Sequence, residues 1–274
     1  MYQVTKSMLK ASQTFDPKIL KYTTKHLKCT TCSKISGIKN LEEKFEELTL
    51  DEETVQFINN CYSSNYQLFK ATYLRPWVLM YYNLTESNAI LGTGKMFLLS
   101  KSHIKTLLNN FTFKNMLDVG AGDGNVTDLF SDFIRGGGIT CTETAQNMIK
   151  VLKTKGYSIQ DNISGEFELV TCLNVLDRCD KPITILKDIY NVKKRFAMFS
   201  IVLPFKGFYN NGKKQCKQLE EVIGCYKEWE ESVHRLCKLF MDIGYTIEKI
   251  SRVPYLSEGD FKKQMYYLDT VIKG

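Results

Sequence analysis

The sequence lacks any apolar run that approaches the roughly 18 residues needed to cross a membrane. Its first twenty residues carry Lys6, Lys10 and Lys18 without an apolar core between them, so they lack the form of a secretory signal. Hydrophobic residues make up 43% and charged residues 24% of the 274 residues, as in ordinary globular proteins. We therefore expect no membrane span, and one large domain or a domain with an added helical piece.

Acidic side chains are almost absent from the first forty residues. This segment holds eight lysines against Asp16 alone, and 8 − 1 gives +7, which is the net charge of the whole chain. The other basic and acidic residues cancel, so the chain is a neutral domain with a basic arm, and nucleic acid is not an expected partner. We expect residues 1–40 to be a basic, solvated and partly mobile extension. The alternative is a contact with nucleic acid or acidic lipid.

The nine cysteines lack the pattern of a disulfide framework, because their number is odd and they are scattered through segments that have strand or helix periodicity. We expect reduced thiols and an intracellular, reducing compartment, with the cytoplasm as the first choice. Cys29 and Cys32 form the only pair at metal or redox spacing. Together with His26 they leave a tetrahedral zinc ion one ligand short, so we expect no metal.

The stretch from Met116 to Glu143 has the pattern of a strand, a tight turn and a helix. An apolar run leads into the glycine-rich turn GAGDG at residues 120–124. Glycine lets the backbone approach a ligand closely, and the start of a helix offers unpaired N–H groups, so the turn suits a nucleotide-like molecule. Apolar residues then follow at helical spacing, namely Val126, Leu129, Phe130 and Phe133.

The glycine-rich turn lacks the residues that dinucleotide and phosphate loops require, which limits the ligands it can bind. Asn125 stands where a dinucleotide loop has its third glycine, and no Lys-Ser/Thr follows as in a phosphate loop. Asp118 would repel a pyrophosphate and suits a cationic ligand. The pattern D-x-G-x-G-x-G, with Gly120 and Gly122, resembles the first motif of S-adenosylmethionine (SAM) methyltransferases, in which the acid lies near the amino-acid end of the cofactor. Glu143 stands where an acid binds both ribose hydroxyls. An ordinary glycine-rich turn with a solvated Asp and Glu is the alternative.

Strands and helices alternate after this turn, which predicts a doubly wound α/β fold. We expect a seven-stranded, Rossmann-like sheet of the SAM-dependent methyltransferase type, preceded by an N-terminal helical extension. The expected domains are a helical region at 41–110 that packs on the core and a methyltransferase domain at 111–274. A long polar loop is expected at 205–224. The expected strands are 116–119, 139–141, 157–160, 167–173, 196–203, 245–250 and 265–271, with helices between them.

Several longer strings resemble the DREV family of methyltransferases. They are LDVGAGDGNVT, CLNVLDRCDKPITILKDI, IVLPF and RVPYLSEGD, together with EEKF, DEET and LGTGKMF, so the resemblance covers about residue 41 to the C-terminus. It implies a protein-histidine methyltransferase that transfers a methyl group from SAM to the N1 (π) nitrogen of histidine in His-x-His sequences and releases S-adenosylhomocysteine. It also implies His-x-His proteins as partners and, beside the cytoplasm, an endomembrane or mitochondrial association. We expect a monomer.

The end of the fourth expected strand should face the methyl acceptor. A neutral imidazole attacks through the lone pair of one nitrogen, so another group has to hold the N–H of the second nitrogen. Asp177 is the candidate for that group, with a helix cap as its alternative role. Asn174 could position the histidine or the amino-acid group of the cofactor. The family pattern places Tyr255, between the last two expected strands, and Tyr266 beside the substrate; Tyr266 could equally be a core tyrosine.

Three further points complete the expectations. Asn162, or its neighbour Asp161, could bond the adenine amino group. The segment Gly92–Gly94 could close over the cofactor or could be a turn between helices. The histidines of the chain itself lack His-x-His spacing, so we assign them no catalytic role. The alternative functions are a non-catalytic SAM or peptide-binding module, and a methyltransferase for protein lysine, RNA or a small molecule.

Overall fold

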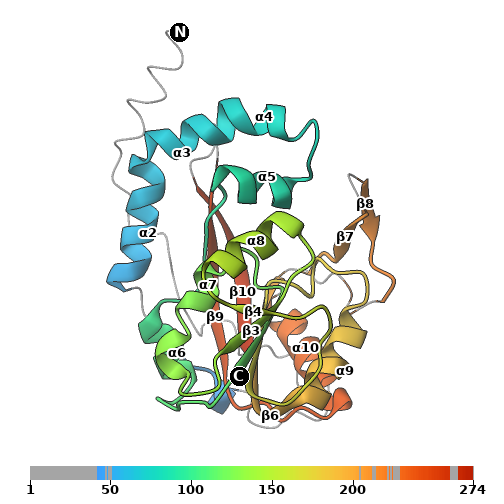
Figure 1. The fold of residues 1–274 in the computed structure, drawn as a ribbon. Helices are drawn as coiled ribbons and strands as arrows, with labels where there is room; N and C mark the ends of the chain where they lie inside the picture. Colours follow the sequence, from blue (N-terminus) through green and yellow to red (C-terminus); the bar gives the residue numbers. More distant parts are fainter. Residues whose placement is uncertain are drawn as a thin grey trace.

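The structure is a computed structural model that describes residues 42–46, 48, 51–203, 205–211, 214–220, 222, 224, 229–259 and 265–273 (Figure 1). The expected basic extension and the Cys29–Cys32 pair with His26 lie outside these residues. For residues 265–273 only the backbone is described. Of the helices in the described part, none combines the length and the apolar character that a membrane crossing requires.

An eight-stranded sheet forms the centre of the described part, in the order β1-β9-β10-β6-β5-β2-β3-β4. Its parallel portion has five strands: β2 (Met116–Val119), β3 (Ile139–Thr142), β4 (Ser158–Ile159), β5 (Phe167–Leu173) and β6 (Lys193–Leu203). The strand β10 (Met265–Lys273) pairs antiparallel with β6 and with β9 (Ile250–Glu258). The two-residue strand β1 (Met96–Phe97) pairs antiparallel with β9 at the edge. The α/β class is confirmed. Seven strands were expected, whereas the parallel portion has five and β10, β9 and β1 extend it.

Helices cover both faces of this sheet, and each face has its own apolar core. On one face α9 (Pro182–Val192) and α10 (Trp229–Ile243) bury Leu186, Ile189 and Phe240. On the other face α6 (Lys101–Leu107), α7 (Asn125–Asp128) and the 3-10 turn η5 (Ser131–Phe133) bury Ile104, Phe130 and Phe133. The helix α8 (Gln146–Thr154) joins β3 to β4. The sheet therefore fixes the turns at the carboxyl ends of its parallel strands from both sides.

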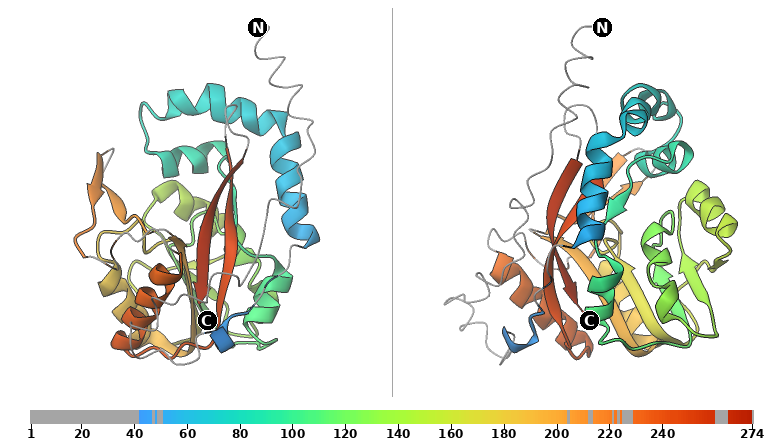
Figure 2. Two further views of the ribbon diagram at one scale, coloured as in Figure 1. Left: turned by 180° about the vertical axis from the view of Figure 1, so that it is seen from behind. Right: turned by 90° about the vertical axis from the view of Figure 1, so that its left-hand side faces the viewer.

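The N-terminal helices lie along one side and over one end of the sheet (Figures 1 and 2). After a short turn η3 (Glu42–Lys44), α2 (Glu52–Ser63) runs along the side. It is followed by α3 (Asn65–Phe69), the π-helical turn η4 (Lys70–Leu74), α4 (Arg75–Val78) and α5 (Leu84–Leu91). The helical character expected between residues 41 and 110 is present, and β1 shows that this region also supplies a strand to the sheet.

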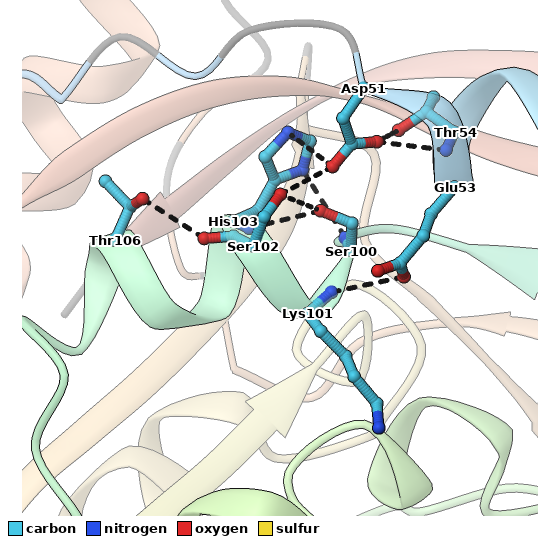
Figure 3. Close-up of polar contacts among 8 residues, drawn as sticks. All are labelled: Asp51, Glu53, Thr54, Ser100, Lys101, Ser102, His103 and Thr106. Atoms are coloured by element: carbon cyan, nitrogen blue, oxygen red, sulfur yellow. Dashed lines mark hydrogen bonds and ion pairs between the residues drawn. The ribbon is translucent and has the colours of Figure 1, made fainter.

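Asp51 attaches α2 to α6 (Figure 3). One carboxylate oxygen accepts a hydrogen bond from the backbone N–H of Thr54 at 3.0 Å, so Asp51 is the N-cap of α2. The other oxygen accepts from the Ser102 hydroxyl at 2.6 Å and lies 3.6 Å from Nε2 of His103. His103 is buried and its Nδ1 accepts from the N–H of Ser100 at 3.4 Å, so this histidine supports the start of α6.

Three sequence-based assignments of secondary structure were wrong. Tyr245 to Lys249 is not a strand: Tyr245 and Ile247 alternate inward onto the core, but no described strand pairs with this segment, and the strand begins at Ile250. As a consequence Tyr255 lies within β9 and not between the last two strands. The helix after the glycine turn is only the four-residue α7, which continues as a 3-10 turn.

The third wrong assignment concerns the expected loop at 205–224. Within the described part of this stretch, β7 (Phe208–Asn211) and β8 (Lys214–Lys217) form an antiparallel hairpin. The sequence contains the signal for it, since Asn211 and Gly212 form an Asn-Gly pair, which favours tight hairpin turns. Figure 1 shows the hairpin projecting from the body of the molecule.

Candidate active site

The glycine turn after β2 is fixed against the end of β3. The N–H groups of Gly120 and Ala121 both donate to the carbonyl oxygen of Thr142, at 2.9 and 3.1 Å. The N–H of Gly122 donates to Oε2 of Glu143 at 2.8 Å. Gly120 and Gly122 have φ angles of +72° and +57°, which glycine adopts without strain. The turn and the acid that follows β3 therefore form one unit, and the expected residues Gly120, Gly122 and Glu143 lie together.

The glycines of this turn have different surroundings. A Cβ atom on Gly120 would lie 2.5 Å from Cγ2 of Val175, and one on Gly124 would lie 2.8 Å from Cδ2 of Leu152. A Cβ on Gly122 would meet nothing within 4 Å. Gly120 and Gly124 thus permit close packing inside the protein, whereas Gly122 presents its backbone to open space. This open side is a cradle that a ligand can enter and that a side chain would fill.

Asp118 lies beneath the turn and is 4% exposed. Its two carboxylate oxygens accept hydrogen bonds from the hydroxyls of Thr127, at 2.5 Å, and Thr171, at 2.6 Å. Burial raises the pKa of this carboxyl to about 6, although both hydroxyl bonds oppose the rise. Asp118 therefore connects β2 to α7 and β5. Its direct contact with a cofactor stays a prediction.

Glu143 is held in one orientation by three backbone N–H groups. Besides Gly122, the N–H groups of Thr144 and Ala145 donate to its Oε1 at 2.7 and 2.9 Å. A carboxylate at the end of a parallel strand, next to a glycine turn, has the position from which an acid binds a ribose diol. Asn162 lies in an exposed turn that follows β4, the strand that pairs with β3. Its carbonyl oxygen accepts from the side chain of Gln160 at 2.7 Å.

Asn174 ends β5 in a left-handed conformation, with a φ angle of +58°. Its N–H donates to the carbonyl oxygen of Ser200 at 2.9 Å, and its side-chain oxygen accepts from the Ser200 hydroxyl at 2.7 Å. Asparagine tolerates this conformation better than most residues. It redirects the chain from β5 into the turn that carries Val175 and Asp177. Since Val175 packs on Gly120, the turn around Asp177 and the glycine turn are in contact.

Asp177 is a buried carboxyl group, 6% exposed, that is only partly satisfied. Its Oδ2 lies 3.5 Å from Nε of Arg178, while its Oδ1 has no hydrogen-bond partner among the described residues. Burial raises the pKa of Asp177, and the charge of Arg178 opposes this rise. A buried acceptor without a protein partner is costly, and a bound water, a ligand or a catalytic role can account for it.

Tyr255 lies next to this carboxylate and is also buried, at 3% exposure. The guanidinium of Arg178 lies 5.8 Å from the centre of its ring, and its hydroxyl contacts the sulfur of Met96 in β1. The backbone of Tyr266 in β10 pairs with Ser257, two residues beyond Tyr255. The side chain of Tyr266 lies outside the described part. The structure therefore brings Asn174, Asp177 and Tyr255 together.

The segment Gly92–Gly94 leads from α5 into β1. Gly92 ends α5 in a left-handed conformation, with φ of +61°. Lys95, which follows this segment, forms two hydrogen bonds with Glu258. The N–H of Lys95 donates to the side-chain oxygen Oε2 of Glu258 at 3.1 Å, and its carbonyl oxygen accepts from the backbone N–H of Glu258 at 2.9 Å. The segment is thus a turn between a helix and a strand.

Sequence reasoning missed two residues of the site. Arg178 could have been found, because a cation that directly follows Asp177 in LDRCD is an obvious partner for its charge. Glu86 had no local signal: its Oε2 accepts from the N–H of Asn147 at 3.0 Å and so caps α8, which begins three residues after Glu143. Nothing in the chain near Glu86 indicates that α5 would contact α8.

Several solved structures are similar to this chain in fold. One is the N-methyltransferase NodS from Bradyrhizobium japonicum in complex with S-adenosylhomocysteine, at 12% identity and a TM-score of 0.38, covering 78% of this chain and 96% of NodS. Another is the precorrin-6y C5,15-methyltransferase from Geobacter metallireducens, at 13% identity and a TM-score of 0.37, covering 62% of this chain and 85% of that one. A third is a structure described by the conversion of a disulfide bond into a thioacetal group during echinomycin biosynthesis. It has 11% identity and a TM-score of 0.43, and the match covers 63% of this chain and 79% of that one.

The family is given by a match over most of the chain. The DREV methyltransferase family matches residues 31–273, so it begins ten residues before the point at which the resemblance was expected to begin. The residues present fit SAM: an open glycine cradle, a fixed carboxylate at the end of β3 and a second turn in contact with the first. The chain belongs to the DREV methyltransferase family, and its cofactor is S-adenosylmethionine.

Proposed function

We propose that the protein is a SAM-dependent protein-histidine methyltransferase that modifies the N1 (π) nitrogen in His-x-His sequences of other proteins. One observation carries the proposal: the buried carboxylate of Asp177 has a free oxygen, Oδ1, in the turn that touches the cofactor turn. A neutral imidazole has one N–H to donate and one lone pair to react with. A fixed acceptor for the N–H selects the tautomer whose other nitrogen is free to attack.

The cofactor supplies a methyl group that is activated by its attachment to a positively charged sulfur. The residues of the chain have to orient the histidine and manage one proton. In this arrangement Asp177 would accept the hydrogen bond from the τ nitrogen, and the π nitrogen would form the new bond to the methyl carbon as the bond from that carbon to sulfur breaks and S-adenosylhomocysteine leaves. The product imidazole is then positively charged and loses its τ proton. Asp177 is placed to take this proton, because burial has raised its pKa.

The same carboxylate disfavours the other acceptors. A lysine has to lose a proton before it can attack, and a buried negative charge beside it would raise the pKa of the lysine and hold it in the unreactive ammonium form. An RNA strand would bring phosphates toward Asp177 and Glu143, which repel them. A neutral imidazole needs no strong base, since its pKa of about 6.5 leaves it mostly unprotonated at pH 7.

Mass spectrometry of a His-x-His peptide incubated with the protein and SAM tests the proposal. We expect a gain of one methyl group on histidine, placed on the π nitrogen by NMR. Asp177→Asn should lower kcat/KM by about 100-fold or more, since an oriented general base typically contributes that much. The matched control is Asp188→Asn on α9, which should leave the rate unchanged.

Two outcomes would contradict this function. Methylation of a lysine peptide or of RNA with no methylated histidine would assign another acceptor. Binding of S-adenosylhomocysteine without turnover of any His-x-His peptide would make the chain a binding module. On the proposed function we expect a monomer in a reducing compartment, which analytical ultracentrifugation and cell fractionation would test.

A further inference from the structure

The strand β7 has one paired edge and one unpaired edge. On one side it pairs with β8, in the register Phe208↔Lys217, Tyr209↔Cys216, Asn210↔Gln215 and Asn211↔Lys214. On the other side no strand of the described part pairs with it. The hairpin projects from the body of the molecule, away from the central sheet (Figure 1). We call the unpaired side of β7 its outer edge.

The hydrogen bond of Phe208 shows which backbone groups lie on the outer edge. Its N–H donates to the carbonyl oxygen of Asp177 at 2.9 Å and therefore points away from β8. In an antiparallel pair, the backbone groups of successive residues point alternately toward the partner strand and away from it. Asn210 thus directs its N–H and its carbonyl oxygen outward, on the same side as Phe208. Asn210 is exposed, and neither of these groups has a hydrogen-bond partner among the described residues.

The outer edge begins at the proposed catalytic group. The main-chain carbonyl of Asp177 accepts the bond from Phe208, and the side chain of the same residue is the candidate that binds the histidine. Residues two apart on a strand are about 7 Å apart, so the outward groups of Asn210 lie about that far beyond this bond. A polypeptide that places a side chain at Asp177 is therefore within two residues of the free groups of Asn210.

The proposed acceptor motif has the period of a strand. In an extended chain, residues i and i+2 point to one side and residue i+1 points to the other. Both histidines of an extended His-x-His segment would face the enzyme, while the middle residue faces away. Hydrogen bonds between main-chain groups then give affinity whatever the middle residue is, as in other proteins that bind a peptide as an added strand. This step rests on the proposed function.

The charge of the hairpin also favours a polypeptide. Residues 206–217 contain four lysines and no acidic residue, and Lys206, Lys214 and Lys217 are exposed. A second copy of the chain, paired hairpin to hairpin, would bring these lysines together, which is unfavourable. An RNA strand suits the lysines but has no amide groups with which to extend a β ladder. An extended polypeptide with carboxylates near the histidines fits both the charge and the free edge.

We propose that β7 is a docking strand for the acceptor protein, whose His-x-His segment adds to the outer edge as a third strand of the hairpin. The carbonyl oxygen of Phe208 and the N–H and carbonyl oxygen of Asn210 supply the hydrogen bonds, and the lysines attract carboxylates beside the motif. The docking strand selects histidines in extended segments and rejects histidines held in helices.

Proline at two paired positions tests the two edges of the hairpin separately. Proline has no N–H and its ring blocks the approach of a neighbouring strand, but it is tolerated where the N–H points out of the sheet. Asn210→Pro alters the outer edge, and Gln215→Pro, opposite it, alters the far edge of β8 and is the matched control. We expect Asn210→Pro to raise the KM for a His-x-His peptide about tenfold and Gln215→Pro to leave it unchanged. The kcat should stay within about twofold in both, because only peptide binding is affected.

A scan of the peptide backbone gives a readout with unaltered protein. The probe is fluorescein-labelled Asp-Ala-Ala-His-Ala-His-Ala-Ala-Asp, and its binding to the protein loaded with S-adenosylhomocysteine is measured by fluorescence anisotropy. Each peptide of the series carries one N-methylated amide and so lacks one N–H. For an added strand we expect binding to weaken about three- to tenfold at every second amide, with little change at those between. Replacement of both aspartates by lysine should weaken binding, and more so at low salt.

The docking strand is overturned if both proline variants have the same KM, or if the effect of N-methylation does not alternate. It is also overturned if single-stranded RNA displaces the peptide from the hairpin. The scan decides the question even where a proline variant has a lowered melting temperature. A peptide that binds with the alternating pattern but is never methylated would leave the docking strand in place and reject the proposed function. A peptide that is methylated on histidine without this pattern would do the reverse.

Discussion

Gly120 and Gly122 have similar left-handed backbone conformations, but a side chain at each would meet different surroundings. Gly120→Ala places a methyl group 2.5 Å from Cγ2 of Val175, in addition to the strain of about 1–2 kcal/mol that an L-residue has in this conformation. We expect it to lower the free energy of unfolding by more than about 2 kcal/mol. Gly122→Ala meets open space and should cost only the strain, yet it should weaken S-adenosylhomocysteine binding at least about tenfold. Urea unfolding and calorimetric titration measure the two quantities.

Val175 provides a control for the Gly120→Ala variant. Adding Val175→Ala to Gly120→Ala removes the overlapping methyl group and should restore part of the lost stability. If Gly122→Ala binds the cofactor product as tightly as wild type, the open side of the turn is not the cofactor cradle.

The buried carboxyl of Asp118 should make stability depend on pH in an unusual direction. Its pKa in the folded protein, about 6, is above the value of about 3.9 that aspartate has in an unfolded chain. The native state therefore binds more protons between these values. The contribution of Asp118 to stability is full below pH 4 and is lost as the pH rises through 6. A difference of two units corresponds to about 3 kcal/mol.

Asp118→Asn removes this titration and keeps a group that can pair with the hydroxyls of Thr127 and Thr171. We expect the variant to gain stability relative to wild type as the pH rises from 5 to 8, measured as urea midpoints at each pH. A constant difference between the two proteins over this range would show that the carboxyl does not titrate there.

At the scale of elements, the sequence predicted those helices and strands whose bounds depend on local residue patterns. The strand Phe167–Leu173 was predicted at its observed bounds, because a continuous apolar run is a local signal. The segment Tyr245–Lys249 has the alternation of a strand, but pairing depends on a partner that local sequence does not specify. The helical stretch from residue 66 to residue 77 shows the same limit for helices: apolar residues recur at helical spacing, yet Tyr66 is 67% and Trp77 is 71% exposed, because the direction in which a helix face points depends on the rest of the fold.

The hairpin β7–β8 is attached by hydrogen bonds to the turn that carries Asp177. The N–H of Phe208 donates to the carbonyl oxygen of Asp177 at 2.9 Å. The side chain of Gln218 donates to the carbonyl oxygens of Leu176, at 2.7 Å, and Cys179, at 2.8 Å. The two ends of the hairpin therefore hold the turn around Asp177 from outside.

Gln218→Ala should loosen this turn and lower kcat/KM for a His-x-His peptide about tenfold, because the position of Asp177 is less well fixed. S-adenosylhomocysteine affinity should stay within twofold, since the two hydrogen bonds of the Gln218 side chain reach the turn around Asp177 and not the glycine turn. Gln215→Ala, on the exposed part of β8, is the control and should have wild-type kinetics. Equal losses in both variants would mean that the hairpin acts as a whole and not through Gln218.

At the scale of the whole molecule, the site is assembled from segments that are distant in the sequence. The turn after β2, Glu143 after β3 and Asp177 after β5 were predicted to meet, because parallel strands place their carboxyl ends at one edge of a sheet. The contributions of the N-terminal region were not predicted. Met96 reaches the hydroxyl of Tyr255, and Glu86 caps α8. Such contacts depend on how the N-terminal helices pack on the sheet, so the spacing of residues within either segment does not predict them.

The bond from Glu86 to Asn147 should therefore couple the N-terminal helices to the cofactor. It fixes the start of α8 immediately after Glu143, whose carboxylate holds Gly122. Glu86→Ala removes the bond and leaves the N–H of Asn147 without this acceptor. We expect S-adenosylhomocysteine to bind about three- to tenfold more weakly and to raise the melting temperature less than in wild type. Glu166→Ala, which removes an exposed ion pair with Lys194, should bind normally. Unchanged affinity in Glu86→Ala would show that α5 covers α8 without contributing to the cofactor site.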